Sequence, residues 1–323
     1  MLHKFKAVAI ASAVALMLAG CSQSAAPSES ANPNASEKIC VYTHGDGGTF
    51  WSVAQKGAEA AAADLGVTLD YQGSNNDAAK QAQTIDAGVA AGCSAIAASA
   101  PDPEAIKTAM LAAHAAGLPT VTMNSGSAVF AELGAFTHVG QDEIIAGEQA
   151  GLKFNAMGVK HVLCPIQEAA NVGLEQRCQG LKNTFKGTVT NFNLDGGLAD
   201  LTASTAKIQA ALQADPSIDA VFALNADIAA KAVLPAEQAL GLTLKVGTVD
   251  MSPEALDAIA AGTMEFAIDQ QQYAQGYMSV VLLHLALSNG NEMGGGQPIY
   301  SGPGFVTKDN VDKVKALVAA GTR

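Results

Sequence analysis

The sequence has little positive charge. It contains 18 lysines and arginines but 30 acidic residues, which gives a net charge of −12. Residues 1–20 hold two lysines and no acidic residue, so the chain without them carries −14. A surface this acidic repels phosphate backbones and anionic lipid headgroups. We therefore expect no nucleic-acid partner.

Catalytic and metal-binding motifs are also missing. There is no G-x-S-x-G nucleophile turn and no H-E-x-x-H zinc motif, and the six histidines are scattered along the chain. No pair of cysteines has the spacing of zinc ligands. We expect a protein that is not an enzyme, has no catalytic residues and holds no metal or other cofactor.

Long apolar runs are absent except at the start, where Ala7 to Ala19 follow Lys4 and Lys6. This run is too short for a membrane span and is typical of a signal peptide over residues 1–20. The sequence Leu18-Ala19-Gly20-Cys21 resembles the bacterial lipobox, which implies that Cys21 becomes the lipidated first residue. A plain secretory peptide with a chance cysteine is the alternative.

Residues 21–37 contain hardly any apolar side chain larger than alanine. Such a segment cannot bury enough surface to offset its ordering entropy, so it predicts a flexible tether. We expect an exported chain that is lipid-anchored on the periplasmic or cell-surface side of the membrane.

From about Lys38 onward, short β-rich runs alternate with longer alanine-rich amphipathic runs. Strands are predicted at Ile39–Thr43, Val67–Tyr71, Ala95–Ala98, Thr120–Met123, His161–Pro165, Thr188–Asn193, Ala220–Leu224, Leu244–Val249 and Glu265–Ile268. Helices are predicted at Phe50–Leu65, Asp77–Ala91, Pro103–Ala116, Asp142–Met157, Gly173–Phe185, Leu201–Ala214, Ala226–Leu240, Pro253–Ala260, Tyr273–Leu287 and Asn310–Ala319. Glycines suited to a left-handed helix stop follow five of them, at Gly66, Gly92, Gly117, Gly158 and Gly241. Serial alternation of this kind predicts parallel sheets covered by helices on both faces.

The segment from Ser125 to Gly140 breaks the alternation and is followed by a new series, so we place a lobe boundary there. Lobe one is expected at about 38–138 plus 271–301, and lobe two at about 139–270 plus 302–323. The chain then crosses between the lobes near His138, Gln271 and Gly302. The expected fold class is α/β, with two doubly wound parallel-sheet lobes joined by a three-strand hinge.

The turn after the first strand runs His44-Gly45-Asp46-Gly47-Gly48-Thr49-Phe50-Trp51. It suggests a dinucleotide-binding fingerprint with Asp70 as the ribose ligand, but the bulky Phe50 stands where the third glycine belongs. An aromatic pair at the end of a parallel strand suits a sugar ring, which stacks well on an indole face. Packing of the first helix is the alternative role for both rings.

Polar residues end several of the apolar strands, namely Ser99, Asn124, Asn225 and Asp250. Because the carboxyl ends of parallel strands share one sheet edge, we expect these side chains to converge there. The alternative for each is to cap the next helix. Glu168 and Glu175 are interpreted as solvated helix charges.

Four segments together resemble the periplasmic ribose- and galactose-binding proteins of sugar ABC importers. They are the turn into Phe50-Trp51 and the runs DAVFALNAD (219–227), KVGTVDMSP (245–253) and AIDQQQYAQG (267–276). The resemblance covers the chain from about Lys38 to Arg323 and implies the type I periplasmic-binding fold.

By the same resemblance, Asn225, Asp250 and Gln270 grip sugar hydroxyls, and Ser99 and Asn124 take the places of further hydroxyl-binding residues. The run from Glu175 to Gly180 is similar to the family's R-x-x-G helix start, which makes Arg177 the ligand-gripping guanidinium. The turn beside the expected pocket adds His44, Asp46, Phe50 and Trp51 to the candidate ligand-binding residues.

The chain also departs from this family. Ribose binders carry an Asp-Arg pair after the fourth strand, whereas this chain has Asn124-Ser125, and the loop from Leu194 to Leu201 has no aromatic residue. We expect a less ionic pocket, and the particular sugar stays open.

Four cysteines remain besides Cys21, in a compartment where disulfides are expected. In the strand order of this fold the strands at Cys40 and Cys93 are neighbours, and Cys178 opens the helix that returns over Cys164. We predict the disulfides Cys40–Cys93 and Cys164–Cys178, with four reduced buried thiols as the alternative.

The resulting hypothesis is a monomeric substrate-binding protein of a sugar or polyol ABC transporter, which closes its two lobes around the ligand. A membrane permease, or alternatively a chemoreceptor, would recognise the closed form. A nucleoside or autoinducer-like ligand is the alternative within the same fold, and an enzyme the alternative outside it. Sugar-responsive transcription regulators share the fold, but the signal peptide and the missing basic headpiece argue against them.

Overall fold

The computed structural model describes residues 37–194 and 197–323 of the chain. The predicted signal peptide, the lipidation site at Cys21 and the tether up to residue 36 lie outside the described residues. All described residues belong to one compact unit, which contains two β-sheets.

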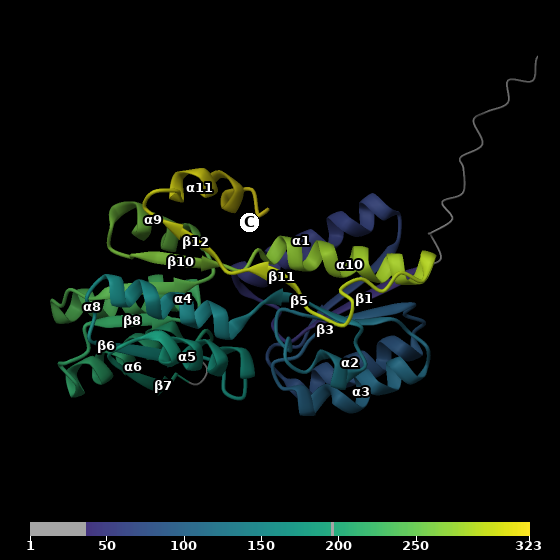
Figure 1. Ribbon diagram of the computed structural model, residues 1–323, viewed down its shortest axis with the longest axis horizontal. Helices are drawn as coiled ribbons and strands as arrows, with labels where there is room; N and C mark the ends of the chain where they lie inside the picture. Colours follow the sequence, from purple (N-terminus) through teal and green to yellow (C-terminus); the bar gives the residue numbers. More distant parts are fainter. Residues whose placement is uncertain (1–36, 195–196) are drawn as a thin grey trace, which may run out of the picture. The chain divides into compact units, whose positions relative to one another are not determined.

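The first lobe is built on a six-stranded parallel sheet with the order β11-β5-β4-β3-β1-β2. Its strands are β1 (Lys38–Thr43), β2 (Thr68–Gly73), β3 (Ala95–Ser99), β4 (Thr120–Met123), β5 (Thr137–Gln141) and β11 (Ile299–Gly302). One face is covered by α1 (Gly48–Leu65) and α10 (Gln272–Asn289), and the other by α2 (Ala78–Ala90), α3 (Pro103–Ala115) and the short 3-10 helix η1 (Phe130–Leu133) (Figure 1). An apolar core therefore lies on each face of the sheet.

The second lobe repeats this arrangement with the order β12-β10-β9-β8-β6-β7. Its strands are β6 (His161–Ile166), β7 (Thr188–Asn193), β8 (Ala220–Ala223), β9 (Lys245–Val249), β10 (Phe266–Asp269) and β12 (Gly304–Thr307), of which only β12 runs antiparallel to its neighbour. Helices α4 (Glu143–Ala156) and α5 (Val172–Thr184) cover one face. The other face is covered by α6 (Leu201–Ala214), α7 (Ala226–Ile228), the π-helix η2 (Ala229–Val233), α8 (Leu234–Leu240), α9 (Pro253–Ala261) and α11 (Val311–Ala319).

The predicted strands and helices are all present, with their ends shifted by at most a few residues. The five helix-stop glycines all have left-handed φ angles, as their positions predicted. Two things differ. The helix expected at 226–240 is interrupted by the π-helix, and the prediction missed β5, β11 and β12.

The three missed strands flank two of the three crossings between the lobes. The chain leaves the first sheet after Gln141, so β5 continues past His138, where the sequence had suggested the boundary. It returns after Gln270 and crosses again between β11 and β12. Gln275 Nε2 donates to Gln270 O (2.9 Å) and to Ser301 Oγ (3.1 Å), which ties the second crossing to the third.

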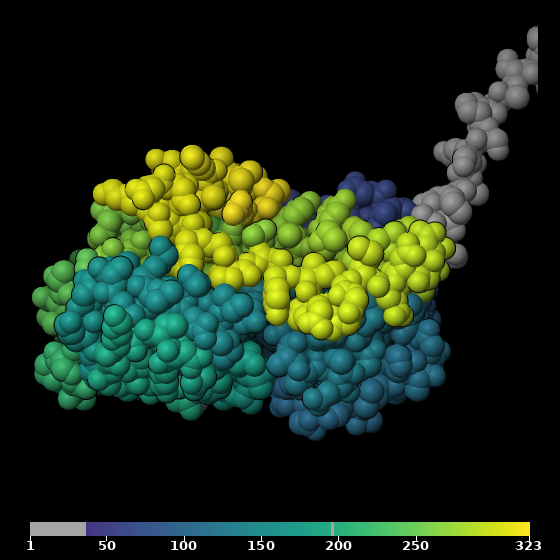
Figure 2. All heavy atoms as spheres, in the orientation of Figure 1, coloured from purple at the N-terminus to yellow at the C-terminus, as the bar shows by residue number. Residues whose placement is uncertain are grey.

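The last part of the chain, yellow in Figures 1 and 2, contributes surface beside both lobes, since β11 joins the first sheet and β12 the second. No helix in the described part of the chain is both long and apolar enough to cross a membrane.

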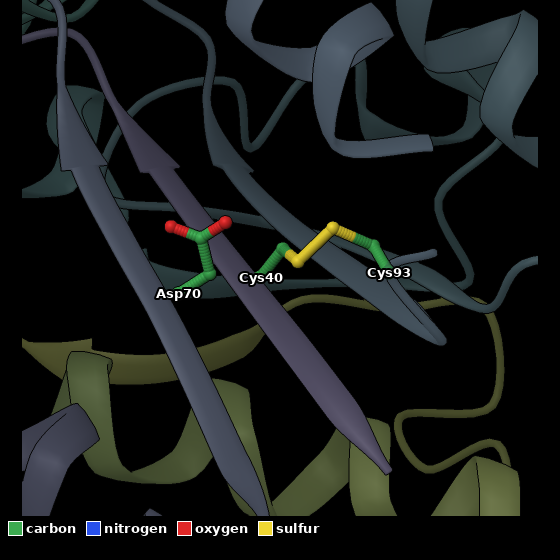
Figure 3. A group of neighbouring side chains, drawn as sticks. All are labelled: Cys40, Asp70 and Cys93. Carbon is green, nitrogen blue, oxygen red and sulfur yellow. A yellow bond between two sulfur atoms is a disulfide. The ribbon is translucent and has the colours of Figure 1, made fainter. Parts of the chain in front are cut away.

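Both predicted disulfides are present. Cys40 in β1 bonds to Cys93 just before β3, and Cys164 in β6 bonds to Cys178 in α5. Asp70 on the neighbouring strand β2 lies beside the first disulfide (Figure 3), with one carboxylate oxygen within 4.8 Å of the sulfurs. Metal binding needs free thiolates, so this oxidised pair with Asp70 is not a metal site.

Candidate functional site

A cavity of about 330 Å³ lies where the carboxyl ends of strands from both lobes meet. Its wall consists of the β1–α1 turn of the first lobe and of residues that follow β2, β4, β6, β7, β8, β9 and β10. Ligands of open α/β sheets bind at this edge. The volume is at the lower end of the range of about 300–1,000 Å³ for small-molecule sites, so it suits a single small ligand.

Nine of the ten candidate ligand-binding residues line this cavity: His44, Asp46, Phe50, Trp51, Asn124, Arg177, Asn225, Asp250 and Gln270. The wall also holds polar residues that the sequence analysis did not select: Asn75, Asn76, Ser125, Gln167, Glu168, Asn171, Asp227 and Lys231. The wall therefore contains several charged side chains. After β4, however, it has Asn124 and Ser125 in place of the Asp-Arg pair of ribose binders.

Ser99 is the exception among the candidates, because it is fully buried and does not line the cavity. Its hydroxyl lies 2.8 Å from both the backbone nitrogen and Nδ1 of His44. It does not cap the next helix either, since Asp102 caps α3. The structure thus places Ser99 in support of His44 rather than at the cavity, because β3 pairs directly with β1 and ends beside the β1–α1 turn.

Asp250 lies at the end of β9, and its carboxylate is held by two amides. Gln270 Nε2 donates to Oδ1 at 2.6 Å, and Asn225 Nδ2 lies 3.5 Å from Oδ2. Burial raises the pKa of Asp250 to about 7, although the nearby Arg177 guanidinium acts in the opposite direction. The alternative role as a helix cap does not apply, because Ser252 caps α9.

Asn225 caps a helix and also lines the cavity. Its Oδ1 caps α7 by accepting from the backbone N–H groups of Asp227 (2.8 Å) and Ile228 (3.3 Å). The capping fixes the amide orientation, so Nδ2 is the group turned toward Asp250 and the cavity. Asn225 can therefore offer a ligand a donor but no acceptor.

Asn124 and Asp250 occupy equivalent positions in the two lobes. Each follows the fourth strand along the chain of its sheet, with a left-handed φ of 62° or 70°. Each donates its backbone N–H to the next strand, Asn124 to Val139 O (2.9 Å) and Asp250 to Ile268 O (2.8 Å). Left-handed non-glycine residues carry a conformational cost and are concentrated at functional sites.

Arg177 lines the cavity but is already bound to the protein. Its Nε and Nη2 donate to the two carboxylate oxygens of Glu143 at 2.6 and 3.0 Å, and Nη1 donates to Leu224 O at 3.0 Å. A guanidinium has five N–H donors, so two remain for a ligand. The buried Glu143 therefore orients Arg177, a role that its position two residues after β5 did not reveal.

Glu168 was interpreted as a solvated helix charge, but it lies in the loop between β6 and α5 and lines the cavity. Asn171 Nδ2 donates to its Oε2 at 2.6 Å. The same oxygen lies 3.7 Å from Nε2 of His44, which belongs to the other lobe. The strand-end rule that selected Asp250 would have found Glu168 only if extended to the second residue after β6, which ends at Ile166.

Phe50 and Trp51 are both 8% exposed and serve the core as well as the cavity wall. Trp51 meets the rings of His44 and Phe50 edge to face, with centroids 4.8 and 4.9 Å apart. A Cβ at position 45 would collide with the Trp51 ring, so glycine there lets the indole lie against the turn. Packing in the core, the alternative considered for both rings, is therefore confirmed, and both rings also line the cavity.

The sequence relatives and the structural neighbours of this chain are of the same kind. The chain matches the periplasmic binding protein domain family over residues 39–292. It is 41% identical to a carbohydrate transporter from Acidothermus cellulolyticus 11B, solved in complex with myo-inositol, with a TM-score of 0.85 over 89% of this chain and 99% of that one. It is also 26% identical to the ribose import binding protein RbsB of Haemophilus influenzae over 282 residues, 85% of this chain and 91% of the relative.

An ABC transporter solute-binding protein from Bacillus halodurans C-125, solved with bound myo-inositol, shares the fold with a TM-score of 0.75 at 21% identity. That match covers 88% of this chain and 98% of the other. The two parallel-sheet lobes form the type I periplasmic-binding fold.

Proposed function

Since this chain belongs to the periplasmic binding protein family, we propose that it is the substrate-binding protein of a sugar or polyol ABC importer. The observation that carries the proposal is a small cavity walled by hydrogen-bonding side chains from both lobes. A ligand there gains its full set of contacts only when the lobes are closed, and this difference in affinity drives closure.

The charges of the wall favour a neutral ligand. Its carboxylates are Asp46, Glu168, Asp227 and Asp250, and its cations are Arg177 and Lys231. Both cations are already paired, Arg177 with Glu143, and Lys231 with Asp227 (2.8 Å) and Glu254 (3.3 Å). A phosphorylated or carboxylated sugar would meet uncompensated negative charge, whereas hydroxyl groups can donate to the carboxylates.

Myo-inositol is the first ligand to test, because the 41% identical carbohydrate transporter was solved in complex with it. A cyclic polyol presents hydroxyl groups around its whole rim, which matches a wall with donors and acceptors on both lobes. A nucleoside is less well suited, since Phe50 and Trp51 are adjacent on α1 and meet edge to face rather than enclosing a flat base.

The described residues support a binding role rather than catalysis. His44 contacts both Ser99 and Glu168, an arrangement that resembles the nucleophile, base and acid of a catalytic triad. However, Ser99 is fully buried and lies outside the cavity. A nucleophile must reach the substrate. In the proposed function, Cys21 anchors a monomer by its lipid, and the closed form is delivered to a permease or, alternatively, to a chemoreceptor.

A thermal-shift screen followed by calorimetric titration tests this function. The panel is myo-inositol, ribose, arabinose, allose, an inositol monophosphate and a nucleoside. Ligand at one hundred times its Kd stabilises the fold by about 2.7 kcal/mol, so a neutral polyol should raise Tm clearly. The phosphate ester and the nucleoside should not. No shift with any sugar or polyol, or a shift with the nucleoside alone, would overturn the proposal.

A further inference from the structure

We propose that His44 and Glu168, which face each other from opposite lobes, clamp one hydroxyl of the ligand, and that Ser99 fixes the His44 tautomer that this clamp requires. The inference rests on the proposed function, in that the ligand carries hydroxyl groups. His44 would donate to the hydroxyl oxygen, and Glu168 would accept its hydrogen.

The hydrogen bonds around Ser99 assign the proton on His44. Ser99 Oγ receives the backbone N–H of His44 (2.8 Å) and is approached by Gln81 Nε2 (3.4 Å). Both partners are donors, and the Gln81 amide is oriented by two carbonyl oxygens, Tyr42 O (3.1 Å) and Ser99 O (2.7 Å). The Ser99 hydrogen is therefore directed to Nδ1 of His44, 2.8 Å away. With Nδ1 acting as the acceptor, the ring proton lies on Nε2.

His44 stays neutral in this position, because burial lowers its pKa. Its side chain is 7% exposed, and its edge-to-face contact with Trp51 fixes the ring plane. The Nε2–H group therefore points from a fixed ring toward the cavity side that Glu168 occupies.

The distance between the two groups suits a shared hydroxyl. His44 Nε2 and Glu168 Oε2 are 3.7 Å apart, which is too long for a direct hydrogen bond. An oxygen at about 2.8 Å from each would accept from Nε2–H and donate to the carboxylate. Asn171 Nδ2 holds the carboxylate in place at 2.6 Å, so both sides of the clamp are fixed before the ligand arrives.

The clamp also lies next to a direct contact between the lobes. Val172 N, at the start of α5, donates to Pro101 O of the first lobe at 3.0 Å. Glu168 belongs to the loop that leads into Val172. A ligand hydroxyl held by His44 and Glu168 therefore adds a second link between the lobes, next to the direct hydrogen bond from Val172 to Pro101. Closure of the lobes and binding of the hydroxyl by His44 and Glu168 would therefore stabilise each other.

Nitrogen-15 NMR of the histidine rings tests the tautomer without any ligand. We expect the His44 proton on Nε2 in the wild type, and a mixture of tautomers in Ser99→Ala, which urea melts must show to be folded. A proton on Nδ1 of wild-type His44 would overturn the inference, whatever the ligand proves to be.

Calorimetric titration with myo-inositol tests the clamp. Glu168→Gln should weaken binding about tenfold, because a charged acceptor becomes neutral. The matched control is Glu175→Gln, which removes the same charge from an exposed position on α5 outside the cavity and should bind as the wild type does. His44→Gln can still present an amide N–H near the Nε2 position, so it should bind more tightly than His44→Asn, which cannot.

The double variant His44→Asn/Glu168→Gln should bind only slightly less tightly than either single variant, because both act on one hydroxyl. Fully additive losses, or wild-type affinity in Glu168→Gln, would overturn the clamp while leaving the proposed function intact. If the wild-type protein binds no sugar or polyol at all, the proposed function itself fails, and the NMR measurement still decides the tautomer.

Discussion

Replacing Asp250 by asparagine should weaken ligand binding and yet stabilise the free protein. Asparagine has nearly the same shape and tolerates the left-handed backbone of this position, where φ is 70°. Alanine would add backbone strain to the loss of the carboxylate, so it is the poorer probe. The substitution therefore isolates the negative charge.

The stability effect follows from the raised pKa. Burial moves the pKa of Asp250 from 3.8 to about 7, so the folded protein binds a proton that the unfolded chain releases between those values. The wild type thus loses stability as pH rises from about 4 to 7, and at pH 8 the cost is about 4 kcal/mol, at 1.36 kcal/mol for each pKa unit. Asp250→Asn lacks this cost, so its advantage in the free energy of unfolding should grow from pH 5 to pH 8.

The affinity effect has the opposite sign. In the proposed function, Asp250 accepts hydroxyl hydrogen bonds in a closed site, and bonds to charged acceptors are the stronger kind. We expect the variant to lose about 2 kcal/mol of binding free energy, roughly thirtyfold in Kd.

Urea melts at pH 5 and pH 8, with titrations of myo-inositol, measure both effects. Asp86→Asn is the matched control, because it makes the same change at an exposed position on α2 and should alter neither quantity. A variant that is less stable than the wild type at pH 8 would refute the desolvation argument. Unchanged affinity would show that the ligand does not use this carboxylate.

Four further predictions concern the same molecule. Ligand binding near pH 7 should release a proton and weaken as pH falls below 7, because hydroxyl donors favour ionised Asp250. Titrations in buffers of different ionisation enthalpy would reveal the released proton, and binding heats that do not depend on the buffer would contradict it. Glu143→Gln should cost about 3–5 kcal/mol in urea melts, since it leaves Arg177 buried without its charge partner, and a cost under 1 kcal/mol would disprove that role. Replacing both cysteines of a disulfide by serine should cost about 4 kcal/mol for Cys40–Cys93 and about 3 kcal/mol for Cys164–Cys178, as their sequence separations of 53 and 14 imply, and a reversed order would count against this loop-entropy account. Mass spectrometry of the membrane-bound protein should find a lipid on Cys21, and an unmodified, freely soluble mature chain would refute it.

The sequence by itself determined most of the secondary structure and the sheet edge at which the cavity lies. Strand and helix periods differ, and glycine is needed for left-handed helix stops, so local patterns were sufficient for the α-helices and for nine of the twelve strands in the described part of the chain. The polar residues that end apolar strands, such as Asn225 and Asp250, followed from the same logic, because parallel strands bring their carboxyl ends to one edge. The disulfide pairs needed the strand order that the family resemblance implied.

Only the tertiary structure decided which strands complete the sheets and how the site residues divide their roles. Strand β11 pairs with β5, which is remote in sequence, and both are short and rich in glycine or polar residues, so no local period marks them. Ser99 supports His44 because β3 lies next to β1 in the sheet, and Glu168 reaches the cavity because its loop faces the other lobe. These roles depend on which loops converge in space, and that is set by packing between residues far apart in the chain.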